Sequence, residues 1–201
     1  MHFVPLSAFA VPLGDATAGR RDSLSGRYGW QWVPLELGLG AKVIDQLYLG
    51  AYVSLGVGYE GSDSRTSARC EAGNDVGDDV SCSSTTVHAG IEARYSFAAA
   101  ESMNGWLGYG FGMTSGNQTI SDAGRYREST TARGLDVARL SGGLDFRPKK
   151  GFGLGPYGVF SVGRYLHTRT EIREDVTFSG DIDAKSFHAW LSIGLRMVVF
   201  P

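Results

Sequence analysis

The sequence lacks the long apolar run of a membrane-spanning helix, since no stretch approaches ~18 to 20 consecutive apolar residues. It also has few stretches with the 3.6-residue apolar periodicity of an amphipathic helix. These absences exclude a helical membrane protein. A hydrophobic content of 42% over 201 residues also excludes a disordered chain, so the apolar residues must be organised in another way.

Basic residues and cysteine are scarce as well. The chain has four lysines and a formal net charge of -2, so no bulk positive field is available and nucleic acid is not a predicted partner. The two cysteines, Cys70 and Cys82, lie on either side of an 11-residue polar segment. One local pair predicts a disulfide in an oxidising compartment. No zinc site is predicted, because no C-x-x-C pair or nearby histidine accompanies them.

Glycine, in contrast, is abundant, with 29 residues. The stretch "GLGPYG" at 153–158 has the G-x-G-x-x-G spacing of a dinucleotide-binding loop, but such a loop must open a helix. Here it contains a proline and continues into "VFSVGRYLH", which has no helical apolar stripe. No nucleotide or other cofactor is therefore predicted. In "GWLGYGFG" at 105–112 the glycines alternate with bulky apolar residues, which indicates a strand with one bare face.

This period of two recurs eight times and predicts an all-β protein with eight strands. The segments are 2–13, 29–41, 46–60, 85–97, 105–116, 134–147, 153–167 and 186–200. The first is interpreted as a strand and not as a signal peptide, because it lacks a basic start and contains Pro5 and Pro12. Each predicted strand has a dry face of apolar residues, and its opposite face carries small or charged residues.

Two observations place the dry face on the outside, against the alternative of a soluble barrel with a dry interior. The second face is rich in glycine and tyrosine, which suits a narrow, crowded interior better than a solvated surface. The connections also alternate in length: those after the second, fourth and sixth segments are short, and the others have some 14 to 24 polar residues. This asymmetry is typical of a transmembrane barrel. We expect six residues to face lipid: Leu49, Val53, Ile91, Leu107, Phe111 and Leu195.

On this pattern the whole chain resembles the OmpA/OmpX-like family of small outer-membrane barrels. The resemblance implies a single domain over 1–201, an eight-stranded antiparallel up-and-down transmembrane β-barrel with short periplasmic turns and long extracellular loops. It also implies the bacterial outer membrane as the location. The ending "GLRMVVFP" is similar to the family's terminal strand signal for the barrel-assembly machinery, although Phe200 is followed here by Pro201.

Charged residues share the inward face of the predicted strands. Charges enclosed in a barrel must pair, because burying an unpaired ion costs several kcal/mol. We therefore expect a plug of salt bridges, with a small gated channel as the alternative. The members of this interior charge network are Glu36, Glu92, Arg94, Arg139, Asp145 and Arg196.

Three histidines, His88, His167 and His188, lie at the outer ends of strands with inward parity. Together they form a candidate rim site, because converging imidazoles can bind metal or transfer protons. A polar rim without chemistry is the favoured interpretation, and no metal is predicted. Resemblance to eight-stranded lipid A deacylases and palmitoyltransferases keeps a lipid A-modifying enzyme as an alternative, although no His-x-Ser pairing like the deacylase's is present.

The predicted loops carry many arginines, whose guanidinium groups suit phosphate. They are Arg20, Arg21, Arg27, Arg125, Arg127, Arg133, Arg164, Arg169 and Arg173. The expected partners are therefore outer-membrane lipids and lipopolysaccharide, with a protein partner at the extracellular loops as a further candidate. The favoured function is a non-enzymatic barrel that serves envelope integrity, surface contact or partner binding.

Overall fold

The computed structural model describes residues 2–14, 30–58, 80–97, 102–122, 126–149, 151–172, 176–181 and 187–199. These residues form nine β-strands: β1 (His2–Gly14), β2 (Gln31–Lys42), β3 (Leu47–Gly58), β4 (Val80–Ser96), β5 (Met103–Asp122), β6 (Tyr126–Lys149), β7 (Phe152–Ile172), β8 (Val176–Asp181) and β9 (His188–Val199). Within the described ranges no helix is long and apolar enough to cross a bilayer.

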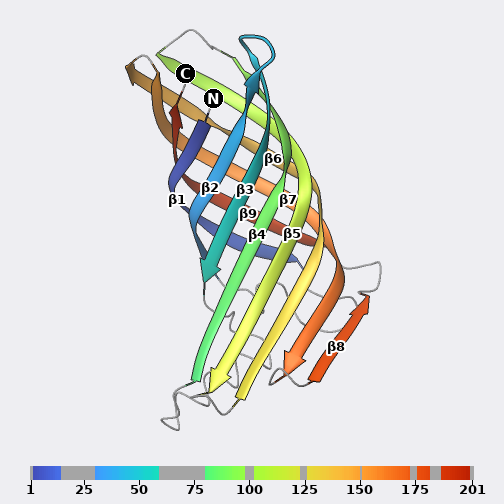
Figure 1. Cartoon of the computed structure of the whole chain (residues 1–201). Helices are drawn as coiled ribbons and strands as arrows, with labels where there is room; N and C mark the ends of the chain where they lie inside the picture. The colour runs from blue at the N-terminus through green and yellow to red at the C-terminus, as the bar shows by residue number, and fades with distance from the viewer. Residues whose placement is uncertain are drawn as a thin grey trace.

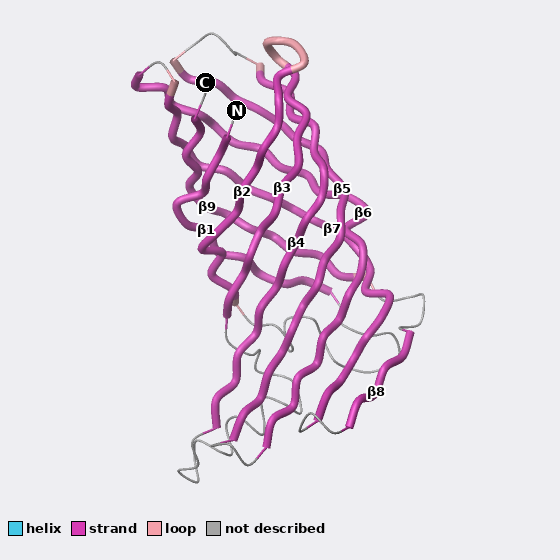
Figure 2. Tube along the Cα trace, viewed as in Figure 1, coloured by secondary structure: helices cyan, strands magenta, loops and turns pink. Residues whose placement is uncertain are grey.

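Eight of the nine strands close into one antiparallel barrel (Figures 1 and 2). Each strand from β1 to β7 pairs with the next, and β9 pairs with both β1 and β7, which closes the ring. The short strand β8 pairs with the outer part of β7 and takes no part in the closure. The predicted eight-stranded up-and-down barrel is confirmed. Closure leaves the eight barrel strands without a free edge in the ring, as a lipid environment requires.

Short connections gather at one end of the barrel. They join β2 to β3, β4 to β5 and β6 to β7 through residues 43–46, 97–102 and 150–151. Both ends of the chain lie at this same end (Figure 1). Short turns mark the periplasmic end of a transmembrane barrel, so the opposite end is the extracellular one.

At the extracellular end, two of the predicted long loops are wrong in part, because the strands continue through them. β5 and β6 run on until only residues 123–125 separate them, and β7 and β8 pair in the same region. Alternation persists there with β-branched residues, and Ile120 and Ala132 are buried on the inner face. We call this part the extension; it comprises 80–86 of β4, 115–122 of β5, 126–133 of β6, 167–172 of β7 and all of β8.

The two faces of the barrel have opposite chemistry, as predicted. The six residues expected to face lipid are each 40 to 59% exposed on the outer surface: Leu49, Val53, Ile91, Leu107, Phe111 and Leu195. Inward rings are at most 5% exposed: Tyr48, Tyr52, Trp106, Tyr157 and Trp190. An apolar belt of this extent is stable only against lipid or another apolar surface.

Interior glycines make room for these rings. A Cβ atom on Gly50 would lie 2.6 Å from Cζ of Tyr48, and one on Gly143 would lie 3.0 Å from Cζ2 of Trp106. Both distances are too short for ordinary contact. The bare faces seen in the sequence are therefore the space into which aromatic side chains pack, and a barrel of eight strands is narrow enough to be filled in this way.

Candidate functional site

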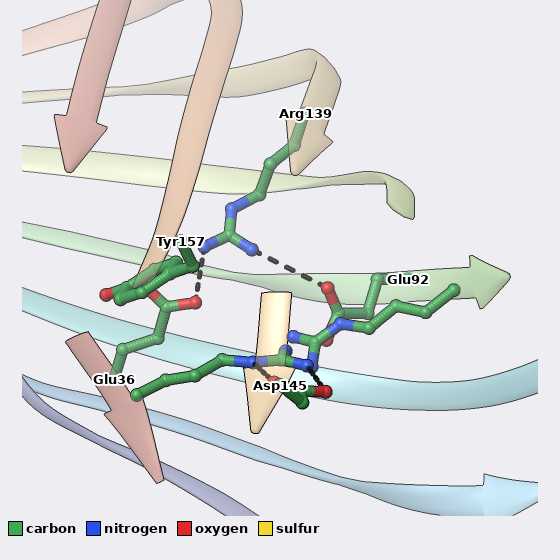
Figure 3. A network of polar contacts seen from close by, with 7 residues as sticks. Glu36, Glu92, Arg139, Asp145 and Tyr157 are labelled. Carbon is green, nitrogen blue, oxygen red and sulfur yellow. Dashed lines mark hydrogen bonds and ion pairs between the residues drawn. The ribbon is translucent and has the colours of Figure 1, made fainter. Parts of the chain in front are cut away.

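The six ionisable residues predicted for the interior all lie inside the barrel. They come from β2, β4, β6 and β9 and are 1 to 4% exposed: Glu36, Glu92, Arg94, Arg139, Asp145 and Arg196. Alternate residues of a strand face the same side. Each strand can therefore place an ionisable residue inward while the residues on either side of it in the sequence face lipid. Figure 3 shows the arrangement.

Four of these side chains form one chain of ion pairs across the barrel. Nη2 of Arg139 lies 2.6 Å from Oε1 of Glu36, and its Nη1 lies 3.7 Å from Oε2 of Glu92. Nη2 of Arg94 lies 2.5 Å from Oε1 of Glu92. The Tyr157 hydroxyl donates to Oε2 of Glu36 at 3.4 Å (Figure 3). The contacts connect β2, β4, β6 and β7 through the interior.

The remaining two ionisable groups form a bidentate pair nearer the periplasmic end. Nε and Nη2 of Arg196 donate to the two carboxylate oxygens of Asp145 at 2.9 and 2.7 Å. Trp106 joins this pair to the first chain, because its ring centroid lies 3.7 Å from Cζ of Arg196 and 4.9 Å from Cζ of Arg94. The six residues, which we call the interior charge network, carry three negative and three positive charges.

Aromatic rings complete the packing around the guanidinium groups. Cζ of Arg139 lies 4.0 Å from the Tyr52 ring centroid, and Cζ of Arg94 lies 5.6 Å from that of Tyr48. Each contact is within the range of a cation–π interaction. Charge pairing and ring packing therefore act on the same arginines, which fixes their side chains across the lumen.

Two of the three candidate rim histidines share one carboxylate. Nδ1 of His88 lies 2.7 Å from Oδ2 of Asp136, and Nε2 of His188 lies 3.1 Å from Oδ1 of the same residue. Asp136 and His188 are each 1% exposed. Ring packing holds the imidazoles in place, with the Tyr165 centroid 4.3 Å from that of His188. Asp136 therefore bridges β4 and β9 from β6.

Asp136 was missed by the sequence analysis because strict alternation from Arg139 points it outward. The register of β6 against β7 shifts between Asp136 and Ala138, and this bulge turns both Asp136 and Arg139 inward. The signal was present in the outward apolar series Leu135, Val137 and Leu140, whose spacing changes from two residues to three.

The predicted inward position of His167 is wrong. The pairing of β7 with β6 shifts between Tyr165 and His167, so Tyr165 is buried at 2% and His167 is exposed on the outer face. His167 lines a recess of the outer surface together with Arg133 and Arg169. The structure therefore does not bring the three histidines to one site.

A small cavity lies between the interior charge network and the histidines. It measures about 20 Å³ and is lined by Glu36, Arg139, His88 and Trp190 among others. A cavity needs roughly 10 to 15 Å³ of such volume to hold one water molecule. The cavity therefore has room for about one water and not for a column of them.

Metal binding, the predicted disulfide and the C-terminal signal are the remaining features considered in the sequence. No group of three His, Cys, Asp or Glu side chains is arranged to hold a metal ion in the described part of the chain. Cys82 lies in β4 opposite Ile120, but Cys70 lies outside the described residues, so the predicted disulfide stays a prediction. Phe200 and Pro201 also lie outside them.

Comparison with known proteins identifies similar folds only. No family model and no curated protein matches the sequence. The chain is similar to the solved structure of Ail, the attachment invasion locus protein of Yersinia pestis, with 14% identity, coverage of 97% of this chain and 95% of that one, and a TM-score of 0.48. It is also similar to Neisserial surface protein A, with 12% identity, coverage of 99% and 97%, and a TM-score of 0.48.

A third similar structure is a major outer membrane protein from Thermus thermophilus, with 13% identity, coverage of 94% and 98%, and a TM-score of 0.47. LpxR from Salmonella typhimurium matches at 11% identity and full coverage of both chains with a TM-score of 0.29. All of these likenesses concern barrel architecture and assign no residue of this chain a role. The barrel architecture of this chain rests on its own closed antiparallel strand pairing, as its sequence predicts.

Proposed function

We propose that this chain is a closed, non-enzymatic β-barrel of the bacterial outer membrane that supports an extracellular sheet for surface contact. Its apolar belt suits a bilayer, and its short turns place both termini in the periplasm. The extension of β4 to β8 then stands outside the membrane, where it is available to other molecules. A protein partner or lipids of the outer leaflet would meet this part of the chain.

The observation that carries the proposal is the interior charge network. Its six groups are all buried, and they bind one another from four strands across the lumen. Opening a water path would separate these pairs in a region of low dielectric, where an uncompensated charge costs several kcal/mol. A closed lumen is therefore the stable state, and a channel would require another arrangement of the same residues.

Planar-bilayer conductance tests this proposal directly. We expect the inserted wild-type barrel to show no steady conductance. The Glu36→Ala variant removes one acid from the network and should introduce brief, small openings, whereas Leu49→Ala on the lipid face should not. A large, steady and ungated wild-type conductance would contradict the closed lumen and favour the channel.

The lipid A-modifying enzyme remains the second candidate, and one observation bears on it. A carboxylate that orients an imidazole is part of several hydrolytic sites, and Asp136 holds both His88 and His188 in this way. Both histidines, however, face the interior, and His188 is 1% exposed. Lipid A mass spectrometry after overexpression should show an unchanged lipid profile; a new acyl pattern that disappears in His88→Asn would support the enzyme.

A further inference from the structure

The outer surface of β5, β6 and β7 changes from apolar to polar along one line. Outward residues on the membrane side of this line are Met113, Leu135 and Leu166, each 42 to 65% exposed. The next outward residues on the extracellular side of the line are Ser115 of β5 and Arg133 of β6, which pair in register. This line marks the level at which the hydrocarbon of the outer leaflet gives way to headgroups.

Two arginines and a histidine from β6 and β7 gather at this boundary on the outer face. Arg133 pairs in register with His167, and Leu135 pairs with Arg164. Arg133 and Arg164 are therefore diagonal neighbours on adjacent strands, across the register shift between Arg133 and Gly134. We call Arg133, Arg164 and His167 the rim patch. The stem of Arg164 lies at the apolar level, and its Cζ is 5.7 Å from the ring centroid of Phe187.

The two arginines keep their charge available. In the part of the chain that the structure describes, neither Arg133 nor Arg164 forms an ion pair with a carboxylate. Arg169 lies two residues beyond His167 on the same outer face and is paired. Its Nη2 lies 2.6 Å from Oε1 of Glu171. The two guanidinium groups that have no ion pair among the described residues therefore lie where the apolar belt ends, whereas Arg169 is paired further from the membrane. Asp181 of β8 pairs in register with His167, on the side of β7 away from Arg133.

A recess adjoins the rim patch on the extracellular side. Arg133 and His167 line it together with hydroxyl and amide groups from Asn117, Ser129 and Thr131 and with the ion pair of Arg169 and Glu171 at its outer end. Its volume is about 260 Å³, many times the roughly 10 to 15 Å³ of such volume that one water needs. Guanidinium forks with adjacent neutral donors are the groups that bind phosphate.

We propose that the rim patch binds a phosphate group of a phosphorylated glycolipid in the outer leaflet, namely the lipid A part of lipopolysaccharide. The lipid's acyl chains would lie against Met113, Leu135 and Leu166, and its phosphate would lie between Arg133 and Arg164. Arg133 lies at the base of the extension and Arg164 lies just below it, beside the exposed apolar residues of the belt. This position at the lipid boundary favours a membrane lipid over a soluble anion. This inference rests on the proposed location of the barrel in the outer membrane.

Native mass spectrometry of the folded barrel with lipid A tests the site. The probes are bis-phosphorylated lipid A and the same lipid after removal of both phosphates. We expect the wild type to retain the phosphorylated lipid in preference to the other. Each of Arg133→Gln and Arg164→Gln should lower that retention about fivefold, the ratio corresponding to ~1 kcal/mol for one charge near a membrane surface. The double variant should lower it about 25-fold.

The matched control is Arg127→Gln, on the same outward face of β6 but six residues beyond Arg133. It should change retention less than twofold. The site is wrong if Arg127→Gln matches the double variant, or if the double variant retains the phosphorylated lipid as the wild type does. Displacement of the lipid by excess inorganic phosphate would identify a free-anion site and overturn the proposal as well.

Two further measurements separate this inference from the proposed function. Heat-modifiable migration on a gel should be the same for all variants, because the substituted side chains lie outside the barrel. If the wild type inserts into bilayers without conducting but does not distinguish the two lipids, the rim patch fails and the closed barrel stands. If the wild type does not insert, the membrane proposal itself fails.

Discussion

The membrane-spanning part of β5, β6 and β7 and the extension of the same strands form one continuous sheet but differ in the chemistry of both faces. In the spanning part the outer face is apolar and the inner face carries Arg139 and Asp145. In the extension the outer face carries Asn117 and Thr131, while the inner face carries neutral Gln118 and apolar Ile120. The medium outside the sheet, and not the sheet geometry, sets which side chains each face can hold.

The inner faces of the spanning part and the extension differ in how their polar groups are satisfied. Among the described residues, the charged side chains that are fully buried in the lumen lie in the spanning part, where they bind one another in pairs. Where the extension begins, the inner contacts are neutral. Thr86 and Ser84 of the extension contact the side chain of Gln31 in β2 at 2.5 and 3.3 Å. We infer that the spanning part gains rigidity from ion pairs that the extension does not need.

The largest expected effect comes from breaking an ion pair in the spanning part. Glu36→Ala leaves Arg139 with Glu92 alone at 3.7 Å, and loss of one partner of a buried pair costs about 3 to 5 kcal/mol. Urea unfolding in lipid bilayers should show this loss in the free energy of unfolding. Adding Arg139→Met should recover much of it, because no unpaired charge then remains.

The neutral counterpart of this experiment is Thr86→Val in the outer part of the lumen. It removes the hydrogen bond to Gln31 and should cost only about 1 kcal/mol. Equal losses for Glu36→Ala and Thr86→Val would show that the two parts of the interior do not differ in the way proposed.

A slightly smaller effect should come from the outer face. Val53→Arg places a charge in the apolar belt and should cost about 2 to 4 kcal/mol if it lies near the bilayer midplane. Thr131→Arg, on the outer face of the extension, should change stability by less than about 0.5 kcal/mol. The same unfolding measurement applies to both. A Val53→Arg barrel as stable as the wild type would contradict the assignment of this face to lipid.

Much of this organisation could be predicted from the sequence, because alternation records which side of a strand each residue occupies. It predicted the eight-stranded closure, the apolar exterior and the inward positions of residues such as Glu92 and Arg196. These conclusions depend only on a period of two within each strand. They fail where the period itself changes.

The bulges in β6 and β7 are such places. One brings Asp136 inward beside His88 and His188, and the other sends His167 outward to the rim patch. Sequence parity therefore grouped His88 and His188 correctly, but it wrongly added His167 and omitted the carboxylate that joins the other two. The extension was missed for another reason: its polar outer face is typical of loops, although alternation with Ile120 and Ala132 continues beneath it.

At the junction of the two parts, Asp136→Asn should have an intermediate effect. Asparagine keeps the size of the side chain but loses the charge that both imidazoles contact, and a buried hydrogen bond to a charged group contributes about 1.5 to 3 kcal/mol. Asp45→Asn, in the exposed turn 43–46, is the control and should leave stability unchanged. A double-mutant cycle of Asp136→Asn with His188→Asn should give a coupling energy; additive losses would show that the bridge does not contribute.

The smallest effect on the barrel is expected from the predicted disulfide between Cys70 and Cys82. A bridge across so short a loop restricts the unfolded chain by roughly 3 kcal/mol in the chain-entropy model. That constraint acts beside the extension and far from the interior charge network, so reduction should leave heat-modifiable migration and conductance unchanged while making the segment 59–79 easier to cleave by protease. Thiol labelling of the unfolded, unreduced protein decides whether the bridge exists, since two labelled cysteines would remove it. If reduction instead destabilised the barrel as much as Glu36→Ala does, the extension and the spanning part would fold as one unit, and the contrast between them would have to be given up.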